Sequence, residues 1–526
     1  MICVRNLRLE PGERESRLKA KAAKALGLTP QQIGNLIILK KSLDARKKSE
    51  IHWLYSVACD VPEEKRILAR CRDASRYVPY EYRIPQARSA LPPLVVGLGP
   101  AGLFAALLLA RAGLRPVVLE RGGDVEERIA AVRTFWERGQ LDPECNVQFG
   151  AGGAGAFSDG KLVTGTHDAR IPFVLRSFHE FGAPESVVYD AKPHVGTDVL
   201  RTVVSGICDE IRSLGGRILF HTRLTGLVTE AGHIAAAEVQ SPEGTRRIEC
   251  TELILAVGHS ARDTFRWLCD LGVPMERKPF AMGVRVEHLQ QSIGEAQYGD
   301  HYVNLPAADY KLNVRLPDGG SVHTFCMCPG GYVVAASSEP GGVCTNGMSY
   351  SGRAGENANS ALLVTLKPED FPGEGVLAGM EWQREIERRC FAAGGGDYSA
   401  LAQKVGDFLR SQPSVGPGSV LPTYRPGVRW CTLDEALPEQ MTRALRQAIP
   451  ALGKKLRGFD APDAVLTAPE TRSSSPVRIL RDAETLQSAI AGLYPCGEGA
   501  GYAGGITSAA VDGMRTAEKV IALHLI

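Results

Sequence analysis

The sequence has 526 residues, of which 44% are hydrophobic and 23% charged, and its formal net charge is +2. This composition is typical of a globular protein and excludes a disordered or fibrous chain. No apolar run is long enough to span a bilayer, and thirteen scattered cysteines do not form the pattern of a small disulfide-rich domain. The start of the chain, MICVRNLRLE, lacks a signal-peptide pattern, and we expect a cytoplasmic protein.

Residues 1–90 form a basic segment in front of a mildly acidic remainder. They contain 19 Lys and Arg against 10 Asp and Glu, which gives +9 and leaves −7 for the rest of the chain. Strand-like runs at 2–9 and 51–59, an amphipathic stretch at 14–28 and a helix start at 29–32 predict a small α+β domain. A proline-bearing linker, 84–93, follows it. The cations either bind RNA or another polyanion or dock on the acidic body, and docking is favoured because no RNA-recognition aromatic motif is visible.

A glycine-rich turn between two short apolar runs is the strongest motif in the chain. Residues 94–96 lead into GLGPAG, a helix-like run follows, and a second strand-like run at 116–119 ends at Glu120. This is the G-x-G-x-x-G dinucleotide fingerprint in its β-α-β context. The first glycine permits a tight turn, the second lets a pyrophosphate approach the backbone, and the third lets helix and strand pack closely. We expect the phosphates at the helix N-terminus, and Glu120 to accept hydrogen bonds from an adenosine ribose.

The next glycine loop, GAGGAGAFSDGK at 150–161, partly resembles two phosphate-binding motifs. The strand before it is too short for a second fingerprint, and Leu162 stands where a P-loop needs Ser or Thr. We therefore expect this loop to lie against the same dinucleotide, because bare backbone tolerates a flat ring or a pyrophosphate. A glycine loop without a ligand is the alternative.

The run ELILAVGH at 252–259 predicts a buried strand that ends at Gly258. The letters GHSAR that begin at Gly258 have Arg where a hydrolase nucleophile elbow needs glycine. We therefore predict that Ser260 is the N-cap of a helix, with Asp263 at its third position.

Between residues 271 and 456 the pattern becomes rich in short strand-like runs separated by Pro and Gly turns. It predicts a strand-rich substrate domain inserted into the nucleotide domain, with helices around 381–392 and 438–449. No second fingerprint occurs there, so we do not expect a dedicated NAD(P)H domain. Any nicotinamide donor would bind transiently over the other cofactor.

Two cysteines in CMCPGG, Cys326 and Cys328, raise the question of a redox pair. Alternate residues of a strand point the same way, so both thiols are expected to be neighbouring packing groups rather than an obligatory redox couple. Metal sites prefer CxxC pairs with a matching second half, which is absent, and we expect no metal. Cys496 is likewise expected to be a packing residue.

Four of these segments together resemble the FAD-dependent flavoproteins of the p-hydroxybenzoate hydroxylase and succinate dehydrogenase class. They are GLGPAG with Glu120, NVQFGAGGAGAFSDGKL (146–162), LILAVGHSARDTF (253–265) and YPCGEGAGYAGGITSAAVDG (494–513). With KPHVGTD (192–198), TFCMCPGG (324–331), NGMSYSGR (346–353) and ETRSSSPVRI (470–479), the set is more closely similar to a bacterial family of FAD-dependent dehydrogenases, also called NAD(P)/FAD-dependent oxidoreductases, with no assigned substrate. The resemblance spans nearly the whole chain.

The resemblance implies an α/β fold with a Rossmann-type FAD-binding domain, an inserted strand-rich substrate domain and a small α+β domain in front. The expected ranges are 1–90 for the basic domain, 91–270 for the first part of the FAD-binding domain, 271–456 for the insertion and 457–526 for the return. The implied activity is FAD-dependent hydride transfer on an unidentified organic substrate, with NAD(P)H as a transient reductant. An RNA-binding flavoenzyme that modifies a base and a non-enzymatic FAD-stabilised interaction protein are the alternatives.

In the flavoproteins of this class the C-terminal glycine loop returns to the nucleotide domain, and its acid reaches the ribityl–phosphate region of FAD. Here that acid is Glu498, where the class more often has Asp. A helix that starts near Thr507 would then favour anionic reduced flavin. The fingerprint and the resemblance together assign the following residues to FAD: Gly97, Gly99, Pro100, Ala101, Gly102, Glu120, Arg121, Gly152, Gly153, Asp159, Gly160, Gly258, Gly497, Glu498, Gly504, Gly505 and Ile506.

The catalytic residues stay unassigned, with three candidates in the family-like segments. Lys161 would support flavin O2 or a substrate carboxylate. His194 precedes a helix start, and a structural role beside a cap formed by Thr197 or Asp198 is favoured over catalysis. Arg472 is either a cation at the flavin or substrate or the partner of Glu470 in a salt bridge.

Overall fold

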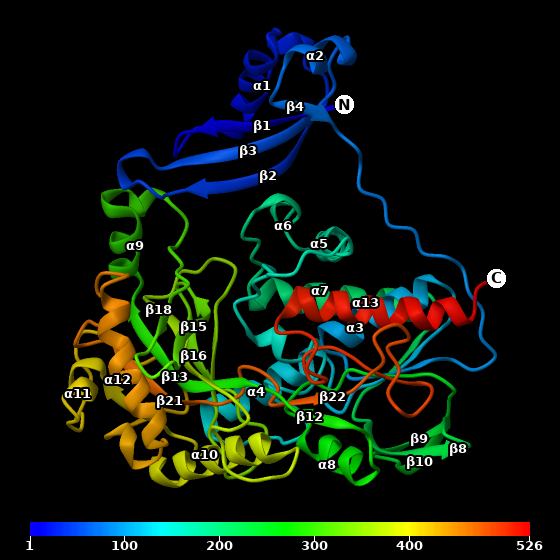
Figure 1. Ribbon diagram of the computed structural model, residues 1–526, viewed down its shortest axis with the longest axis vertical. Helices are drawn as coiled ribbons and strands as arrows, with labels where there is room; N and C mark the ends of the chain where they lie inside the picture. Colours follow the sequence, from blue (N-terminus) through cyan, green and yellow to red (C-terminus); the bar gives the residue numbers. More distant parts are fainter.

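The computed structural model describes residues 1–526, and its N-terminal module is a four-stranded antiparallel sheet under two helices (Figure 1). The strand order is β2-β3-β1-β4. The elements are β1 (Ile2–Leu9), α1 (Leu18–Leu26), β2 (Leu36–Asp44), β3 (His52–Cys59), α2 (Glu64–Arg70) and β4 (Ala74–Arg76). Apolar residues of the sheet and helices, such as Val4, Leu18 and Val57, form its core. The helix expected from residue 29 is only a 3-10 turn, Pro30–Gln32, and the basic run begins inside β2.

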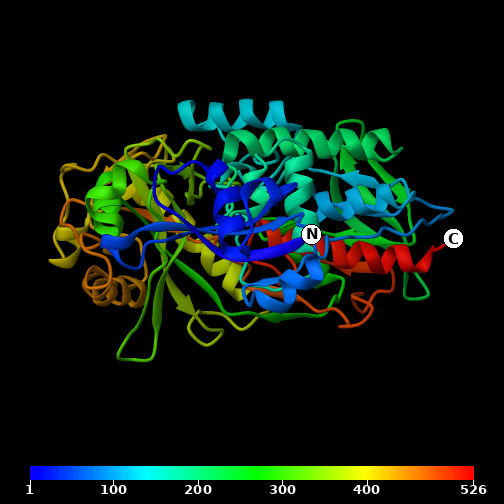
Figure 2. The same cartoon turned by 90° about the horizontal axis from the view of Figure 1, so that it is seen from above.

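The module lies over the middle of the body, above the junction between its two halves (Figures 1 and 2). The amide of Ala191 donates to the carbonyl of Lys41 in β2 at 2.8 Å, so the contact is made by backbone. Lys41 itself pairs with Glu15, and no ion pair joins residues 1–76 to the body. The module thus contacts the body, the alternative that was favoured, and this contact is made by backbone groups without an ion pair.

A five-stranded parallel sheet in the order β23-β11-β5-β6-β7 organises one half of the body. Its strands are β5 (Leu94–Val96), β6 (Val117–Leu119), β7 (Arg217–Leu219), β11 (Leu253–Leu255) and β23 (Leu493–Pro495), each of three residues, all buried except in the edge strand β7. Helices α3 (Pro100–Arg111), α7 (Thr197–Ser213) and α13 (Ile506–Leu523) pack beside it around the largest apolar core. This half also contains α4 (Val125–Arg138), α5 (Ile171–Glu180), α6 (Ser186–Tyr189) and α8 (Arg262–Asp270).

The other half is built on a seven-stranded sheet in the order β14-β15-β18-β13-β21-β19-β20 (Figure 1). Its strands are β13 (Phe280–Leu289), β14 (Asn313–Arg315), β15 (Ser321–Cys328), β18 (Asn357–Leu366), β19 (Ala400–Lys404), β20 (Val428–Trp430) and β21 (Val465–Glu470). Helices α9 (Gln290–Tyr298), α10 (Ala378–Gly394), α11 (Val405–Leu409) and α12 (Glu439–Gly453) and a hairpin of β16 (Tyr332–Ala335) and β17 (Thr345–Met348) accompany it. Because β21 belongs to this sheet, the chain returns to the first half after Glu470, later than expected.

Two small sheets complete the body. One is the meander β8 (Arg223–Glu230), β9 (His233–Ser241) and β10 (Gly244–Glu249), and the other pairs β12 (Met275–Arg277) with β22 (Val477–Ile479) where the chain passes between the two halves. No helix combines the length and the apolar content needed to cross a membrane. The predicted fold class, an α/β nucleotide domain with a strand-rich insertion and a small α+β domain in front, is confirmed.

Candidate functional site

A large pocket opens at the carboxyl ends of four parallel strands, which is where open α/β sheets bind ligands. The residues that directly follow β5, β6, β11 and β23 all line it, and its far end is walled by residues of β15, β17 and β21. The pocket therefore reaches from the nucleotide fingerprint to the seven-stranded sheet.

The three fingerprint glycines are needed for three different reasons. Gly97 has φ +95°, in the left-handed region, and a Cβ there would fall on the carbonyl of Ala256. A Cβ on Gly102 would fall on the carbonyl oxygen of Gly97, so α3 packs on the turn only without a side chain. Gly99 has an ordinary φ of −73°, and its nearest neighbour would be the Cα of Gly153 at 3.8 Å. Nothing in the chain itself requires glycine at position 99, so the bare backbone there is left for a ligand.

Glu120 ties the first glycine loop to the second. Its Oε2 accepts from the amide of Leu98 at 2.8 Å, and its Oε1 accepts from the amides of Gly122 and Gly150 at 2.9 Å each. The amide of Gly152 also donates to the carbonyl of Leu98 at 2.8 Å. Glu120 lines the pocket, and its carboxylate has an organising role that the sequence did not predict.

A buried arginine that sequence reasoning missed holds the second glycine loop. Arg128 of α4 donates to the carbonyls of Asn146, Val147 and Ala151 at 2.7–2.9 Å. Burial lowers the pKa of Arg128 to about 10, so it stays charged at neutral pH. A loop of glycines has no side chains with which to fix its shape, and Arg128 supplies the missing hydrogen bonds.

The C-terminal glycine loop meets α3 through two glycines. A Cβ on Gly513 of α13 would fall on the carbonyl of Ala101, and one on Gly497 would lie 2.7 Å from the Cβ of Ala101. Gly504 and Gly505 have no neighbour closer than 4.0 Å at their Cβ positions, and both line the pocket. The loop is therefore tightly packed at its ends and bare where it faces the cavity. The hydroxyl of Thr507 donates to the carbonyl of Leu162 at 2.7 Å, which joins this loop to the second one.

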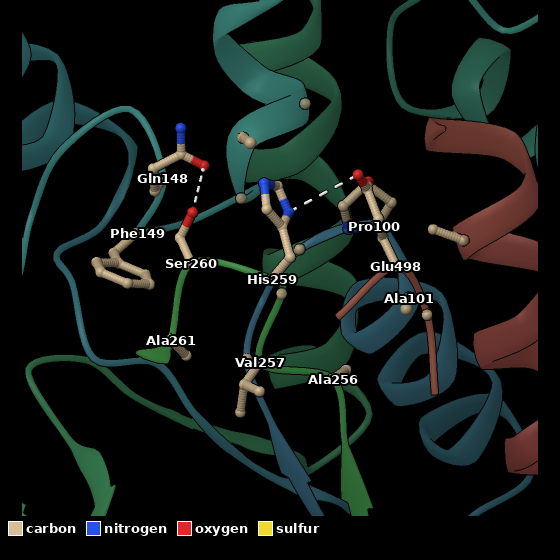
Figure 3. A pocket seen from close by; sticks show the side chains of 18 of the residues that line it. Pro100, Ala101, Gln148, Phe149, Ala256, Val257, His259, Ser260, Ala261 and Glu498 are labelled. Atoms are coloured by element: carbon tan, nitrogen blue, oxygen red, sulfur yellow. Dashed lines mark hydrogen bonds and ion pairs between the residues drawn. The ribbon is translucent and has the colours of Figure 1, made fainter. Parts of the chain in front are cut away.

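Glu498 lies on the pocket wall beside the start of α3 and faces His259 (Figure 3). Its Oε1 is 3.7 Å from Nδ1 of His259. Burial raises the pKa of Glu498 to about 7, and burial lowers the pKa of His259 to about 4. The neighbouring amide of Gly497 donates to Asp512 at 2.8 Å, and Asp512 pairs with Arg481 at 2.6 Å. Two acids thus serve this loop: Asp512 of α13 stabilises the turn, and Glu498 faces the cavity.

The predicted N-cap role of Ser260 is wrong. Helix α8 begins at Arg262 after Ala261 and has no side-chain cap. The hydroxyl of Ser260 instead donates to Oε1 of Gln148 at 3.1 Å, across the pocket wall (Figure 3). The tertiary contact with the second glycine loop replaces the local hydrogen bond to the helix.

Arg472 does not pair with Glu470, so that expectation is also wrong. Its guanidinium makes two hydrogen bonds, of 2.8 and 2.7 Å, to the carboxylate of Glu387 in α10, and Arg262 binds the same carboxylate at 2.9 Å. Burial alone would raise the pKa of Glu387, but these two arginines hold that pKa well below its usual value. Arg472 lines the pocket, but its charge is committed to this buried network.

Asp159 is the centre of a second polar cluster, at the end of the second glycine loop. It accepts from Arg353 at 2.6 Å and from the hydroxyl of Ser349, and Nζ of Lys161 lies 3.6 Å away. Although burial alone would raise it, the cations of Lys161 and Arg353 hold the pKa of Asp159 below its usual value. Asp159 thus joins the glycine loop to the segment after β17.

His194 lies behind this cluster and does not line the pocket. Its Nδ1 donates to the carbonyl of Asp159 at 2.9 Å, and burial lowers its pKa to about 4, so the ring is neutral. Helix α7 begins at Thr197 as expected, but neither predicted residue caps it: Thr197 donates to the carbonyl of Ala156, and Asp198 accepts from Ser351. The structure therefore gives His194 a supporting place rather than a catalytic one.

The far wall of the pocket contains Cys326, whose backbone departs from the expected strand. Its φ is +41°, and the register of β15 against β18 shifts between Phe325 and Cys328. The prediction that both thiols point the same way is wrong, because this bulge turns Cys326 into the cavity and leaves Cys328 buried next to Arg285. Burial raises the pKa of Cys326 to about 12, so its thiol is neutral.

Two family models and one relative match this chain. A model described as "FAD-dependent protein, C-terminal domain-like" matches residues 279–473, and a domain of unknown function matches residues 1–60. A protein of Clostridium beijerinckii, described as "Uncharacterized protein", is 45% identical over 530 residues, which covers 99% of this chain and 98% of that one. The chain belongs to this family of FAD-dependent proteins. The prediction of an FAD-dependent oxidoreductase family with an unassigned substrate is confirmed.

Solved flavoprotein structures resemble this chain only loosely. Aklavinone-11 hydroxylase with FAD and aklavinone is 14% identical over 82% of this chain and 62% of that one, with a TM-score of 0.38. The quinol fumarate reductase FrdA of E. coli is 12% identical over 83% and 71%, with a TM-score of 0.38. The glycerol-3-phosphate dehydrogenase of Bacillus halodurans with FAD is 12% identical over 82% and 64%, with a TM-score of 0.35. These similarities are too low to carry a residue role or a substrate to this chain.

The residues present fit FAD. Gly258 and Gly504 line the pocket and have open space at their Cβ positions, and a Cβ on Gly99 would meet only an ordinary contact, which is what a closely bound cofactor requires of a backbone. Of the seventeen residues assigned to FAD from the sequence, fifteen line the pocket, and Gly102 and Gly152 lie behind it as packing glycines. Arg121 lines the pocket, but its guanidinium is held by Glu144 and Asp263 and lies over the ring of Phe149.

Proposed function

We propose that this FAD-dependent protein transfers a hydride between the flavin and a small organic substrate, and that NAD(P)H is the transient reductant of the flavin when the substrate is the one reduced. One observation supports it above the others. The pocket that begins at the dinucleotide fingerprint ends against polar side chains of the seven-stranded sheet, Cys326 and Glu470, and of the β16–β17 hairpin, Asn346. Such an end, outside the nucleotide fingerprint, offers room and polar groups for a second molecule beside the cofactor.

FAD supplies the redox chemistry in such a site, and the chain supplies binding, orientation and electrostatics. Gly99 and the N-terminus of α3 would receive the pyrophosphate, and Glu120 the adenosine ribose. The bare backbone at Gly504 and Gly505 and the start of α13 would lie along the isoalloxazine, and Glu498 along the ribityl chain. The partial positive charge of the α13 N-terminus would favour negative charge on that ring.

The wall formed by β15, β17 and β21 would exclude water from the reacting face and position the substrate there. Glu470 is held by Arg285 at 3.1 Å and by Thr345 at 3.4 Å, so it is fixed rather than free to move. Arg472 is fixed by Glu387 in the same way. A rigid wall of this kind supports the positioning that hydride transfer needs.

Anaerobic reduction of the purified protein by NADH and by NADPH tests the proposal, followed by reoxidation with a panel of metabolites. We expect bleaching of the flavin absorbance and its return with a subset of organic acceptors. A flavin that is reduced by dithionite but returns with no acceptor except oxygen would count against an oxidoreductase function.

A further inference from the structure

The four cations that line the pocket differ in whether they already have partners. Arg121 and Arg223 both bind Glu144 and Asp263, with their shortest contacts at 2.8 and 3.0 Å. Arg472 binds Glu387 at 2.7 Å. Lys161 makes no hydrogen bond, and its one ion pair, with Asp159, is 3.6 Å long. Lys161 is therefore the cation of this pocket whose N–H donors are uncommitted.

The charges around Lys161 do not balance. Asp159 and Glu470 are the carboxylates at this end, and Lys161, Arg353 and Arg285 are the cations that face them, while His194 is neutral. Arg353 already donates two hydrogen bonds to Asp159, of 2.6 and 3.3 Å, and Arg285 pairs with Glu470. Two carboxylates against three cations leave one positive charge, at a side chain that is 29% exposed and lines the cavity.

A second uncommitted donor lies at this end. Asn346 of β17 lines the pocket, and its Oδ1 accepts from the amide of Gly347 at 2.8 Å, while its Nδ2 donates to no group of the chain. The oxygens of Glu470 are occupied by Arg285 and Thr345. The thiol of Cys326 is a weak donor beside them. The end of the pocket thus offers an ammonium and an amide whose donors are uncommitted.

We propose that the substrate is an organic carboxylate, and that Lys161 and Asn346 receive its carboxylate group beside Cys326. This inference rests on the proposed function and names the substrate class of that site. A carboxylate has one negative charge, which matches the single excess positive charge, whereas a phosphate dianion would leave one charge unmatched. Hydrogen bonds from a cation to a carboxylate are about twice as strong as neutral ones, so Lys161 contributes most of the selectivity.

The test is a titration of the FAD-loaded protein with acetate and benzoate and with their neutral counterparts, acetamide and benzamide. Binding is read from the change in the flavin absorbance. We expect at least one of the two carboxylates to bind about tenfold or more tightly than its amide, the smallest effect of a hydrogen bond to a charged group. Lys161→Gln should reduce that affinity to the level of the amide, and Asn346→Ala should weaken it less.

Lys192→Gln is the matched control, because Lys192 is an exposed lysine that pairs with Asp309 outside the pocket. It should bind the anions as the wild type does. Equal affinity for carboxylates and amides in wild-type protein, or unchanged anion binding in Lys161→Gln, would overturn the proposal. So would a Lys161→Gln variant that shifts the reduction potential of the anion-free flavin and nothing else, since Lys161 would then serve the flavin. A protein that binds FAD and is reduced but ignores both carboxylates refutes this inference alone, whereas a protein without FAD refutes the proposed function first.

Discussion

Replacement of Gly99 by valine should abolish FAD binding without disturbing the fold. At position 99 the φ of −73° is open to any residue, and the nearest heavy atom to a new Cβ is 3.8 Å away. The apoprotein should therefore keep its stability to within about 1 kcal/mol, the scale of a change at a helix N-cap. The isopropyl group instead fills the space above the N-terminus of α3, where the pyrophosphate is expected.

The size of the loss follows from the hydrogen bonds that the backbone can no longer make. Two charge-assisted bonds of about 1.5–3 kcal/mol each amount to about 3–6 kcal/mol. The dissociation constant of FAD should then rise by about 10²–10⁴-fold. Wild-type protein should be stabilised by about 2.7 kcal/mol when FAD is present at 100 times its dissociation constant, and the variant should lose that gain.

The assay is a fluorescence titration of apoprotein with FAD, together with thermal melting followed by circular dichroism. Gly102→Ala is the matched control, because its methyl group would fall on the carbonyl of Gly97 and should destabilise the fold itself. Full FAD occupancy in Gly99→Val would refute the role of this loop. Melting of apo Gly99→Val well below apo wild type would refute the claim that glycine is there for the ligand.

Four further predictions concern other parts of the molecule. Gly505→Leu, at a position with open space on the pocket side, should weaken FAD binding or distort the flavin spectrum while the N-terminal module stays folded; unchanged spectrum and affinity would place the loop away from the flavin. A double variant with Ser at Cys326 and Cys328 should keep its rates of flavin reduction and reoxidation, and uptake of two electrons beyond the flavin by wild-type protein would contradict this. Because the raised pKa of Glu498, about 7, lies above the usual 4.5, the apoprotein should lose stability as pH rises from about 4.5 through 7, and Glu498→Gln should flatten that part of the pH profile measured by denaturant unfolding. Full-length protein should bind RNA only non-specifically, with a dissociation constant of about 10⁻⁴–10⁻⁶ M that rises steeply with salt, and submicromolar sequence-selective binding in an anisotropy titration would favour the RNA alternative.

The fingerprint and the fold class could be predicted because their signals are local. Gly97, Gly99 and Gly102 stand within one turn between a strand and a helix, and a contact within or beside that turn explains Gly97 and Gly102. The same holds for the return of the C-terminal glycine loop, whose resemblance to known flavoproteins carried its position. Short-range spacing and glycine content were sufficient for these parts.

The pairing of charged side chains could not be predicted, because it depends on residues far apart in the chain. Arg472 lies two residues from Glu470 but binds Glu387 of α10, since β21 ends at Glu470 and Arg472 lies beyond the strand. Asp159 pairs with Arg353, which is 194 residues away. Sequence spacing gives no signal for such pairs, although the unexplained segment NGMSYSGR did contain Asn346, Ser349 and Arg353.

The bulge at Cys326 shows a second limit. Alternation along a strand predicts that Cys326 and Cys328 share a face, but the register shift and the positive φ of Cys326 separate them. Cysteine is not one of the residue types that are enriched at positive φ, so the residue at position 326 does not predict the bulge. The predicted N-cap role of Ser260 is wrong for a related reason, because its hydroxyl binds Gln148 of a distant loop rather than the nearby helix.

Identification of the flavin that the purified protein holds, combined with an anaerobic reductive titration, tests the central claim most directly. We expect one non-covalent FAD per chain that takes up two electrons. We also expect that NADH or NADPH can supply those electrons. Absence of flavin, or the presence of FMN, would contradict this claim, because FMN has no adenosine ribose for Glu120 and no pyrophosphate for the backbone at Gly99.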